Sequence, residues 1–214
     1  MKTTELVFIL DKSGSMAGKE EDTIGSFNAT IKEQKEKDYR VIVSTVLFSD
    51  RDRIIHDRIP IEELKPMTDK DYCVGGCTAL IDAIGNTVEH IRTIHKYIRK
   101  EDVPSKTLFV IITDGLENAS SRYSSDEVKK MIEGQKEEGW EFLFLGANID
   151  SVETAKSIGI ESNRTVDYVC DSKGVGVAHR AACNFMSAVF SAEPKAMIDD
   201  SWREEADMDY KSRN

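Results

Sequence analysis

Short apolar runs alternate along the chain with longer stretches in which apolar residues recur every three or four positions. The short runs are typical of buried β-strands, and the longer pattern is typical of amphipathic helices. This alternation predicts an α/β domain with a doubly wound, mostly parallel six-stranded sheet and helices on both faces. The expected strands are Leu6–Leu10, Val41–Phe48, Ile54–Ile59, Lys106–Thr113, Trp140–Leu145 and Thr165–Val169. The main expected helices are Glu20–Lys35, Thr78–Arg99, one opening at Ser124, Asp150–Ser157 and Val177–Phe190.

One connection in this pattern is expected to be antiparallel. The polar segment 49–53 joins Val41–Phe48 to Ile54–Ile59 as the turn of a hairpin, which places one antiparallel strand at an edge of the sheet. Farther along, Ser124 stands three residues before Glu127 in the spacing of a capping box. This spacing predicts the start of a helix.

The chain is expected to form one domain followed by a short tail. Its 214 residues suffice for one substantial core, which would bury about 70% of the surface of the unfolded chain. The last helical pattern stops near Ala192, where Glu193-Pro194 would break a helix. We therefore expect a domain over residues 1–192 and a charged, mobile tail over residues 193–214.

Composition and charge argue against several classes of partner. Hydrophobic residues make up 40% of the chain and charged residues 32%, and no apolar run approaches the roughly 18 residues that a membrane span needs. The net charge of −10 argues against nucleic acid as a partner, because nucleic-acid binding needs clustered Lys and Arg. The short apolar stretch near the N-terminus does not resemble a signal peptide, so a cytoplasmic protein is expected.

The four cysteines are expected to be reduced thiols in that compartment. Cys73 and Cys77 have a spacing seen in zinc sites, but Cys170 and Cys183 are too far apart to match it and no paired His completes a set. A zinc site is therefore not expected.

Oxygen-bearing side chains gather in three segments that are expected to meet at one edge of the sheet. Asp11, Ser13 and Ser15 follow the first strand, while Thr78 lies in a glycine-rich loop that opens a helix and Asp114 follows the central strand. Ligands of open α/β sheets bind beyond the carboxyl ends of the strands, where these segments would lie. Two carboxylates and three hydroxyls suit a hard divalent cation such as Mg²⁺. Each segment alone is also compatible with ordinary turns and helix caps, so the combination carries the prediction.

The pattern D-x-S-x-S after the first strand, a Thr in the second loop and T-D-G after the central strand resembles the von Willebrand factor A (VWA) domain. The resemblance covers residues 4–192 and is closest to compact, single-domain members from bacteria and their viruses. It implies that Asp11, Ser13, Ser15, Thr78 and Asp114 form a metal-ion-dependent adhesion site (MIDAS) holding Mg²⁺ or Mn²⁺. It also implies an open coordination position, which an Asp or Glu carboxylate of a protein partner fills.

The leading hypothesis is a metal-dependent protein-binding module without catalytic activity, a monomer or a weak homo-oligomer. A Mg²⁺-dependent hydrolase or phosphotransferase is an alternative, since an aspartate after a first parallel strand also serves as nucleophile in the haloacid dehalogenase family. Ser13 stands where that family's D-x-D pattern has its second aspartate, so no general acid is evident. In a further alternative, a tail carboxylate fills the metal site of a neighbouring copy, the candidates being Asp199, Asp200, Glu204 and Glu205.

Several other residues admit both a functional and a structural interpretation. Glu117 is either an outer-sphere partner of the metal or a solvated loop residue, and the second is favoured. Asn118 is expected to cap a turn. Gly174-Val175-Gly176 has part of a dinucleotide-binding pattern, but His179 stands where its third glycine belongs. No functional role is expected for the four histidines. Two residues either support the first loop or are surface and capping groups: Asp22 and Thr23.

Overall fold

The apolar runs form one mixed six-stranded sheet in the order β3-β2-β1-β4-β5-β6. The computed structural model describes residues 3–147, 150–192 and 196–213. Strands β2 and β3 pair antiparallel at one edge, and the other neighbouring strands pair parallel. The predicted fold class is therefore confirmed. The strands are β1 (Thr3–Asp11), β2 (Arg40–Phe48), β3 (Asp52–Pro60), β4 (Lys106–Thr113), β5 (Glu141–Ala147) and β6 (Thr165–Tyr168).

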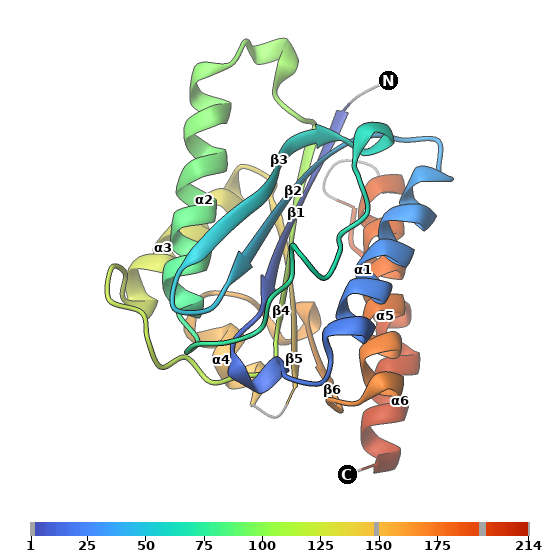
Figure 1. Cartoon of the computed structure of the whole chain (residues 1–214). Helices are drawn as coiled ribbons and strands as arrows, with labels where there is room; N and C mark the ends of the chain where they lie inside the picture. The colour runs from blue at the N-terminus through green and yellow to red at the C-terminus, as the bar shows by residue number, and fades with distance from the viewer. Residues whose placement is uncertain (1–2, 148–149, 193–195, 214) are drawn as a thin grey trace.

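Helices cover both faces of the sheet, which makes the fold a three-layer sandwich (Figure 1). One face carries α1 (Glu20–Lys35) and α5 (Ser172–Ser191), and the other carries α2 (Leu80–Tyr97), α3 (Ser125–Glu137) and α4 (Ser151–Ser157). Successive side chains of a strand point to opposite faces, so the buried strand β1 serves both cores. Its residues Leu6, Phe8 and Leu10 pack on the α1 and α5 side, and Val7 and Ile9 pack on the α2 side.

The strand order reverses between β1 and β4, the two central strands. From β1 the chain proceeds outward through β2 to β3, and from β4 it proceeds outward through β5 to β6. A crevice opens beyond the carboxyl ends of the strands at such a reversal, because the connecting segments diverge to opposite sides. The fold therefore places Asp11, the last residue of β1, and Asp114, which directly follows β4, at the edge where an α/β sheet binds ligands.

Helix α5 begins five residues earlier than the sequence pattern predicts. The Asp171 side chain accepts a hydrogen bond from the Gly174 backbone N–H at 2.8 Å and so caps the helix at Ser172. A Cβ at Gly174 would lie 1.8 Å from the Val169 carbonyl oxygen, so only glycine permits this close approach of helix to strand. Gly174-Val175-Gly176 is thus part of a helix that packs against the end of β6, and not a dinucleotide loop. The capping box predicted at Ser124 is present at the start of α3.

The C-terminal segment differs from the expected mobile tail. Residues 196–213 include a 3-10 turn (Asp200–Arg203) and helix α6 (Glu204–Arg213), which lies alongside α5 (Figure 1). Trp202 is buried and its ring centroid lies 4.8 Å from that of Phe185 on α5. The expected helix break at Glu193-Pro194 lies outside the described residues. Contacts of this kind, an aromatic pair and ion pairs such as Glu205 with Arg180, leave no periodic pattern in the sequence and so could not be expected from it.

The two edge strands of the sheet are short or irregular. Strand β6 has four residues. Strand β3 changes register against β2 near Thr45, and Arg58 on β3 has a φ of 54°, in the left-handed region that non-glycine residues rarely adopt. The Arg58 side chain turns toward the sheet, where its Nε donates to Glu5 Oε1 at 2.7 Å. The Glu5 side chain is fully buried in β1 and also bonds His95 of α2 at 2.5 Å.

Candidate metal site

The first two candidate loops are joined by backbone hydrogen bonds. Gly14 N donates to Gly76 O at 3.0 Å, and Gly75 N donates to Lys12 O at 2.8 Å. Gly76 has a φ of 85°, and a Cβ built on it would lie 2.1 Å from Asp50 Oδ2, so this position needs glycine. The glycine-rich loop therefore lies directly against the D-x-S-x-S loop, as the sheet topology predicted.

The second and third loops are joined through Asn118 and Glu117. Thr78 N donates to Asn118 Oδ1 at 2.9 Å, and Asn118 N donates to Thr78 O at 3.0 Å, so Asn118 fixes the Thr78 backbone from both sides. The Glu117 carboxylate accepts from Ile81 N at 2.9 Å and from Ser120 N at 2.7 Å. Glu117 is thus bonded within the protein and is not the solvated loop residue that was favoured from the sequence. It ties the third loop to the start of α2, where the positive end of the helix dipole favours a carboxylate.

Asp11 lies at the end of β1 with its carboxylate held on both oxygens. Ser13 N donates to Oδ1 at 2.7 Å and Thr113 Oγ1 donates to Oδ2 at 2.6 Å. The buried hydroxyl of Tyr72 donates to the Asp11 carbonyl oxygen. Burial raises the pKa of the Asp11 carboxyl above its usual value, and the hydrogen bonds from Thr113 and Ser13 oppose this rise. A buried carboxylate of this kind is stabilised by any cation that approaches it.

Asp114 and the two serines form a connected set of oxygens. Ser15 Oγ donates to Asp114 Oδ1 at 2.5 Å and lies 3.0 Å from Ser13 Oγ. The Asp114 side chain has no exposed surface, whereas Ser15 is exposed at the rim of the site. Cys170 Sγ, which follows β6, lies 3.4 Å from Asp114 Oδ2. The set therefore has a buried base and one open side.

Lys19 is a cation in direct contact with this set, and the sequence patterns did not single it out. Its Nζ lies 2.6 Å from Asp114 Oδ2 and donates to the Ser15 carbonyl oxygen at 2.7 Å. Burial lowers the pKa of the Lys19 ammonium, but the contact with Asp114 outweighs it, so the pKa is raised overall. Lys19 is therefore charged and paired with the carboxylate of Asp114.

The three loops leave a small space beside Gly115 that is lined by oxygens. A Cβ built on Gly115 would lie 2.9 Å from Thr78 Oγ1, 3.1 Å from Ser15 Oγ and 3.7 Å from Asp11 Oδ2. Oxygens from the first and second loops thus converge on one point beside Gly115 of the third loop, and the third-loop carboxylate of Asp114 is bonded to Ser15. These donors suit a hard cation such as Mg²⁺ or Mn²⁺. The structure brings the five predicted residues together, and their role as metal ligands stays a prediction.

The site differs in chemistry from one built of histidines, thiols and acids. No group of three or more His, Cys, Asp or Glu side chains that could share a metal ion is found in residues 3–147, 150–192 and 196–213. The candidate site has two carboxylates, and hydroxyls supply its remaining oxygens. Each histidine is bonded elsewhere, the pairs being His56 with Thr45, His90 with Asp57, His95 with Glu5, and His179 with Thr30.

Other predicted residues have structural contacts. Asp22 accepts a hydrogen bond from Ser172 Oγ at 2.6 Å and so joins α1 to the start of α5, and Thr23 is buried within α1. Cys77 lies in the second loop, and its backbone N–H donates to Asp50 Oδ1 at 2.8 Å. In the tail, Glu205 pairs with Arg180 at 2.7 Å. These contacts contribute to the fold, and none of these residues is added to the five candidate ligands.

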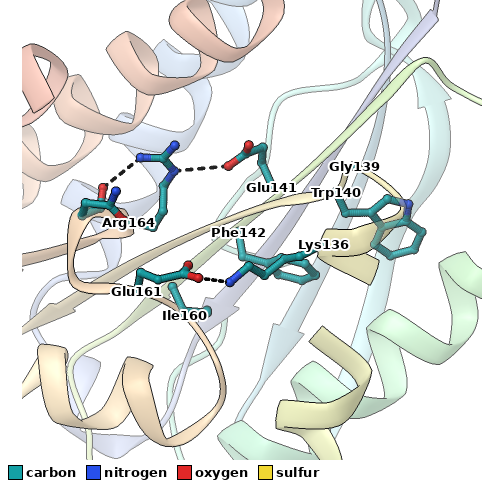
Figure 2. Close-up of a pocket in the computed structure, with 9 residues that line it drawn as sticks. Lys136, Gly139, Trp140, Glu141, Phe142, Ile160, Glu161 and Arg164 are labelled. Carbon is teal, nitrogen blue, oxygen red and sulfur yellow. Dashed lines mark hydrogen bonds and ion pairs between the residues drawn. The ribbon is translucent and has the colours of Figure 1, made fainter. Parts of the chain in front are cut away.

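A second concavity lies at the opposite ends of the strands. Figure 2 shows this pocket of about 350 Å³, which is lined by residues that precede or begin β5 and β6. Its two cations are both paired within it, Lys136 with Glu161 and Arg164 with Glu141 at 3.2 Å. The paired charges give it no evident means of holding a charged ligand, so it is not the preferred functional site.

Within the described chain, no helix combines the length and apolar character needed to cross a membrane.

Comparisons with known proteins support the architecture. No protein-family model and no curated protein sequence matches the chain. Its structure resembles the vWF domain of the type V pili tip protein Mfa5 from Porphyromonas gingivalis, with 10% identity and a TM-score of 0.66. That match covers 93% of this chain and 99% of the other. The von Willebrand factor type A protein from Catenulispora acidiphila gives 13% identity and a TM-score of 0.60, over 90% of this chain and 43% of that one.

A third similar structure contains a metal. Proximal thread matrix protein 1 from the mussel byssus, solved with a zinc-occupied MIDAS motif, gives 14% identity and a TM-score of 0.57 over 85% of this chain. The chain spans about half the length of that mussel protein, 46%. Identities this low are evidence for a shared fold and do not extend to a shared ligand. The chain has the fold of a VWA domain.

Proposed function

We propose that this chain is a metal-dependent protein-binding module. In this proposal, a divalent cation, Mg²⁺ or Mn²⁺, is held by Asp11, Ser13, Ser15, Thr78 and Asp114. An Asp or Glu carboxylate of a partner protein then binds to the cation. The main support is that oxygens of Asp11, Ser15 and Thr78 converge on one point beside Gly115, while Asp114 of the same loop as Gly115 is bonded to Ser15.

Charge explains why such a site would select a carboxylate. Asp11 and Asp114 together neutralise a divalent cation, and the three hydroxyls add no charge. Because only two of the five ligands carry a negative charge, the bound cation would keep enough positive character to favour an anionic oxygen over water. Leu116, directly after Gly115, is 65% exposed and offers an apolar contact beside the incoming acid. Metal and leucine together would form a recognition surface at the carboxyl edge of the sheet.

Binding is proposed in preference to catalysis. A hydrolase would need a general acid or base near the metal, and the described histidines are bonded to residues outside this site. The Lys19 ammonium is paired with Asp114 and the Thr113 hydroxyl with Asp11. These groups position the carboxylates and leave no evident proton donor for a leaving group.

Selection from a random peptide display library tests the proposal. The immobilised chain is screened with 5 mM Mg²⁺, with 5 mM Mn²⁺ and with EDTA. We expect enriched peptides to carry an Asp or Glu, and their binding to fall at least tenfold in EDTA or when that residue is changed to its amide. The site variants Asp11→Asn and Thr78→Ala should lose this binding. Asp126→Asn, an exposed position on α3, is the matched control and should keep it.

Equal recovery of the same peptides with metal, with EDTA and with Asp11→Asn would refute the proposal. Peptides that bind the Asp126→Asn control and both site variants equally would place the binding surface elsewhere. A phosphate ester that wild type turns over and Asp11→Asn does not would favour the hydrolase alternative instead.

A further inference from the structure

Lys19 occupies a position in the fold that is unfavourable for a lysine. It is the residue that precedes the first turn of α1, where Ser, Thr, Asp or Asn normally cap the helix, and no side-chain cap is formed there. The positive end of the helix dipole also disfavours a cation at this position. The side chain instead turns back over the first loop, with the ammonium placed on Asp114 and on the Ser15 carbonyl oxygen. The contact with Asp114 must therefore offset the missing helix cap and the unfavourable helix dipole.

The target of Lys19 is the carboxylate that has most need of a counter-charge. The Asp114 side chain is completely buried, and its other bonded groups are neutral: the Ser15 hydroxyl and the Cys170 thiol. Asp11, in contrast, receives two strong donors from Ser13 and Thr113. A buried carboxylate is costly without a cation, so Lys19 stabilises the folded loops whenever no metal is bound.

We propose that Lys19 is an internal cation that competes with the metal for Asp114, and so raises the metal concentration at which the site fills. The inference rests on the proposed function, and it adds a regulatory residue to that site. A divalent ion among these oxygens would lie a few ångströms from the ammonium, and like charges at that distance repel strongly. Metal uptake therefore requires the ammonium to leave Asp114. The flexible four-carbon stem of lysine and its 19% side-chain exposure give it a path to solvent.

Titration with Mn²⁺, followed by electron paramagnetic resonance of the free ion, measures this competition directly. Lys19→Met removes the charge and keeps the length of the side chain, and Lys19→Arg keeps the charge. Lys32→Met makes the same change at an exposed position of the same helix. We expect Lys19→Met to bind Mn²⁺ at least tenfold more tightly than wild type, with Lys19→Arg and Lys32→Met within about threefold of wild type. Competition by Mg²⁺ should show the same order.

Thermal unfolding gives a second, independent readout. In EDTA, Lys19→Met should unfold at a lower temperature than Lys32→Met, because Asp114 has lost its counter-charge. Added Mn²⁺ should raise the Lys19→Met midpoint by more than it raises that of wild type.

The outcomes separate this inference from the proposed function. If wild type binds Mn²⁺ and Lys19→Met binds it with the same or weaker affinity, Lys19 only supports the loop and the inference is overturned alone. If neither wild type nor any Lys19 variant takes up millimolar Mn²⁺, both the proposed function and the inference are overturned. Uptake by Lys19→Met where wild type shows none supports the competition in its strongest form.

Discussion

Gly115 gives the sharpest test of the oxygen-lined space, because a single methyl group would enter it. In Gly115→Ala the new Cβ meets Thr78 Oγ1 at 2.9 Å and Ser15 Oγ at 3.1 Å, both shorter than the 3.4 Å of an ordinary contact. Overpacking of this kind costs about 1–3 kcal/mol, and the two hydroxyls must move away by about 0.3–0.5 Å to relieve it. Metal sites tolerate ligand displacements of about 0.2 Å. The substitution should therefore weaken both folding and metal binding.

We expect Gly115→Ala to lower the free energy of unfolding by about 1–3 kcal/mol. We also expect it to weaken Mn²⁺ binding by about 10–100-fold, as is typical when the surroundings of a metal ligand are disturbed. Urea unfolding followed by far-ultraviolet circular dichroism, with EDTA present, measures the first effect. Isothermal titration with Mn²⁺ measures the second.

Gly134→Ala is the matched control, because it adds the same methyl group at a helical glycine of α3 with nothing within 4 Å. Alanine has the higher helix propensity, so this change should raise the free energy of unfolding by about 0.5–1 kcal/mol and leave Mn²⁺ affinity unaltered. The two substitutions should thus have opposite effects on stability. If Gly115→Ala is as stable as wild type and binds Mn²⁺ equally, the proposed arrangement of Thr78, Ser15 and Asp11 around a metal is refuted.

Two further predictions concern the side of the fold formed by α5 and α6. Burial lowers the pKa of His179 from 6.5 to about 4, so between these pH values the unfolded chain binds a proton that the folded chain does not. As the pH falls from 7 to 4, wild type should therefore lose about 3 kcal/mol of unfolding free energy relative to His179→Asn, measured by urea titration. Parallel pH profiles of the two proteins would contradict this. Trp202→Ala should lower the free energy of unfolding by about 3–5 kcal/mol, because the indole is buried against Phe185. Met208→Ala, at an exposed position of the same segment, should change it by less than about 0.5 kcal/mol. Equal effects of the two substitutions would mean that the C-terminal segment does not contribute to the core.

The sheet could be predicted from the sequence because its strands are buried on both faces and read as continuous apolar runs. The prediction began β1 at Leu6, but the strand begins at Thr3. The polar residues at its start also adopt strand conformation, because β1 is central and pairs with β2 and β4 on its two sides. The prediction also started α5 too late, since glycine is usually read as a loop residue. The close approach of Gly174 to Val169, which depends on tertiary packing, is what places a glycine inside that helix.

The candidate ligands could be predicted because they lie in three segments, after β1, before α2 and after β4, and the topology brings those segments together. The residues that position these ligands could not be predicted from the sequence. Tyr72 reaches the Asp11 backbone across 61 positions of sequence, and Lys19 reaches Asp114 across 95. Neither contact produces a local pattern, because each depends on how a loop folds over its neighbour. Asn118 is expected from the sequence only to cap a turn, and the structure adds that its backbone and side chain both hold Thr78.

The irregular edges of the sheet have a consequence for how copies of the chain can associate. A second sheet can extend the first only along a straight ladder of free backbone N–H and C=O groups. At one end β6 offers four residues, and at the other Arg58 breaks the ladder of β3 with its left-handed backbone while its side chain is held by Glu5. Lateral growth into a continuous sheet, the route to cross-β aggregates, is therefore disfavoured on both sides. Copies of this protein should consequently pair edge to edge less readily than sheets whose edge strands are long and regular.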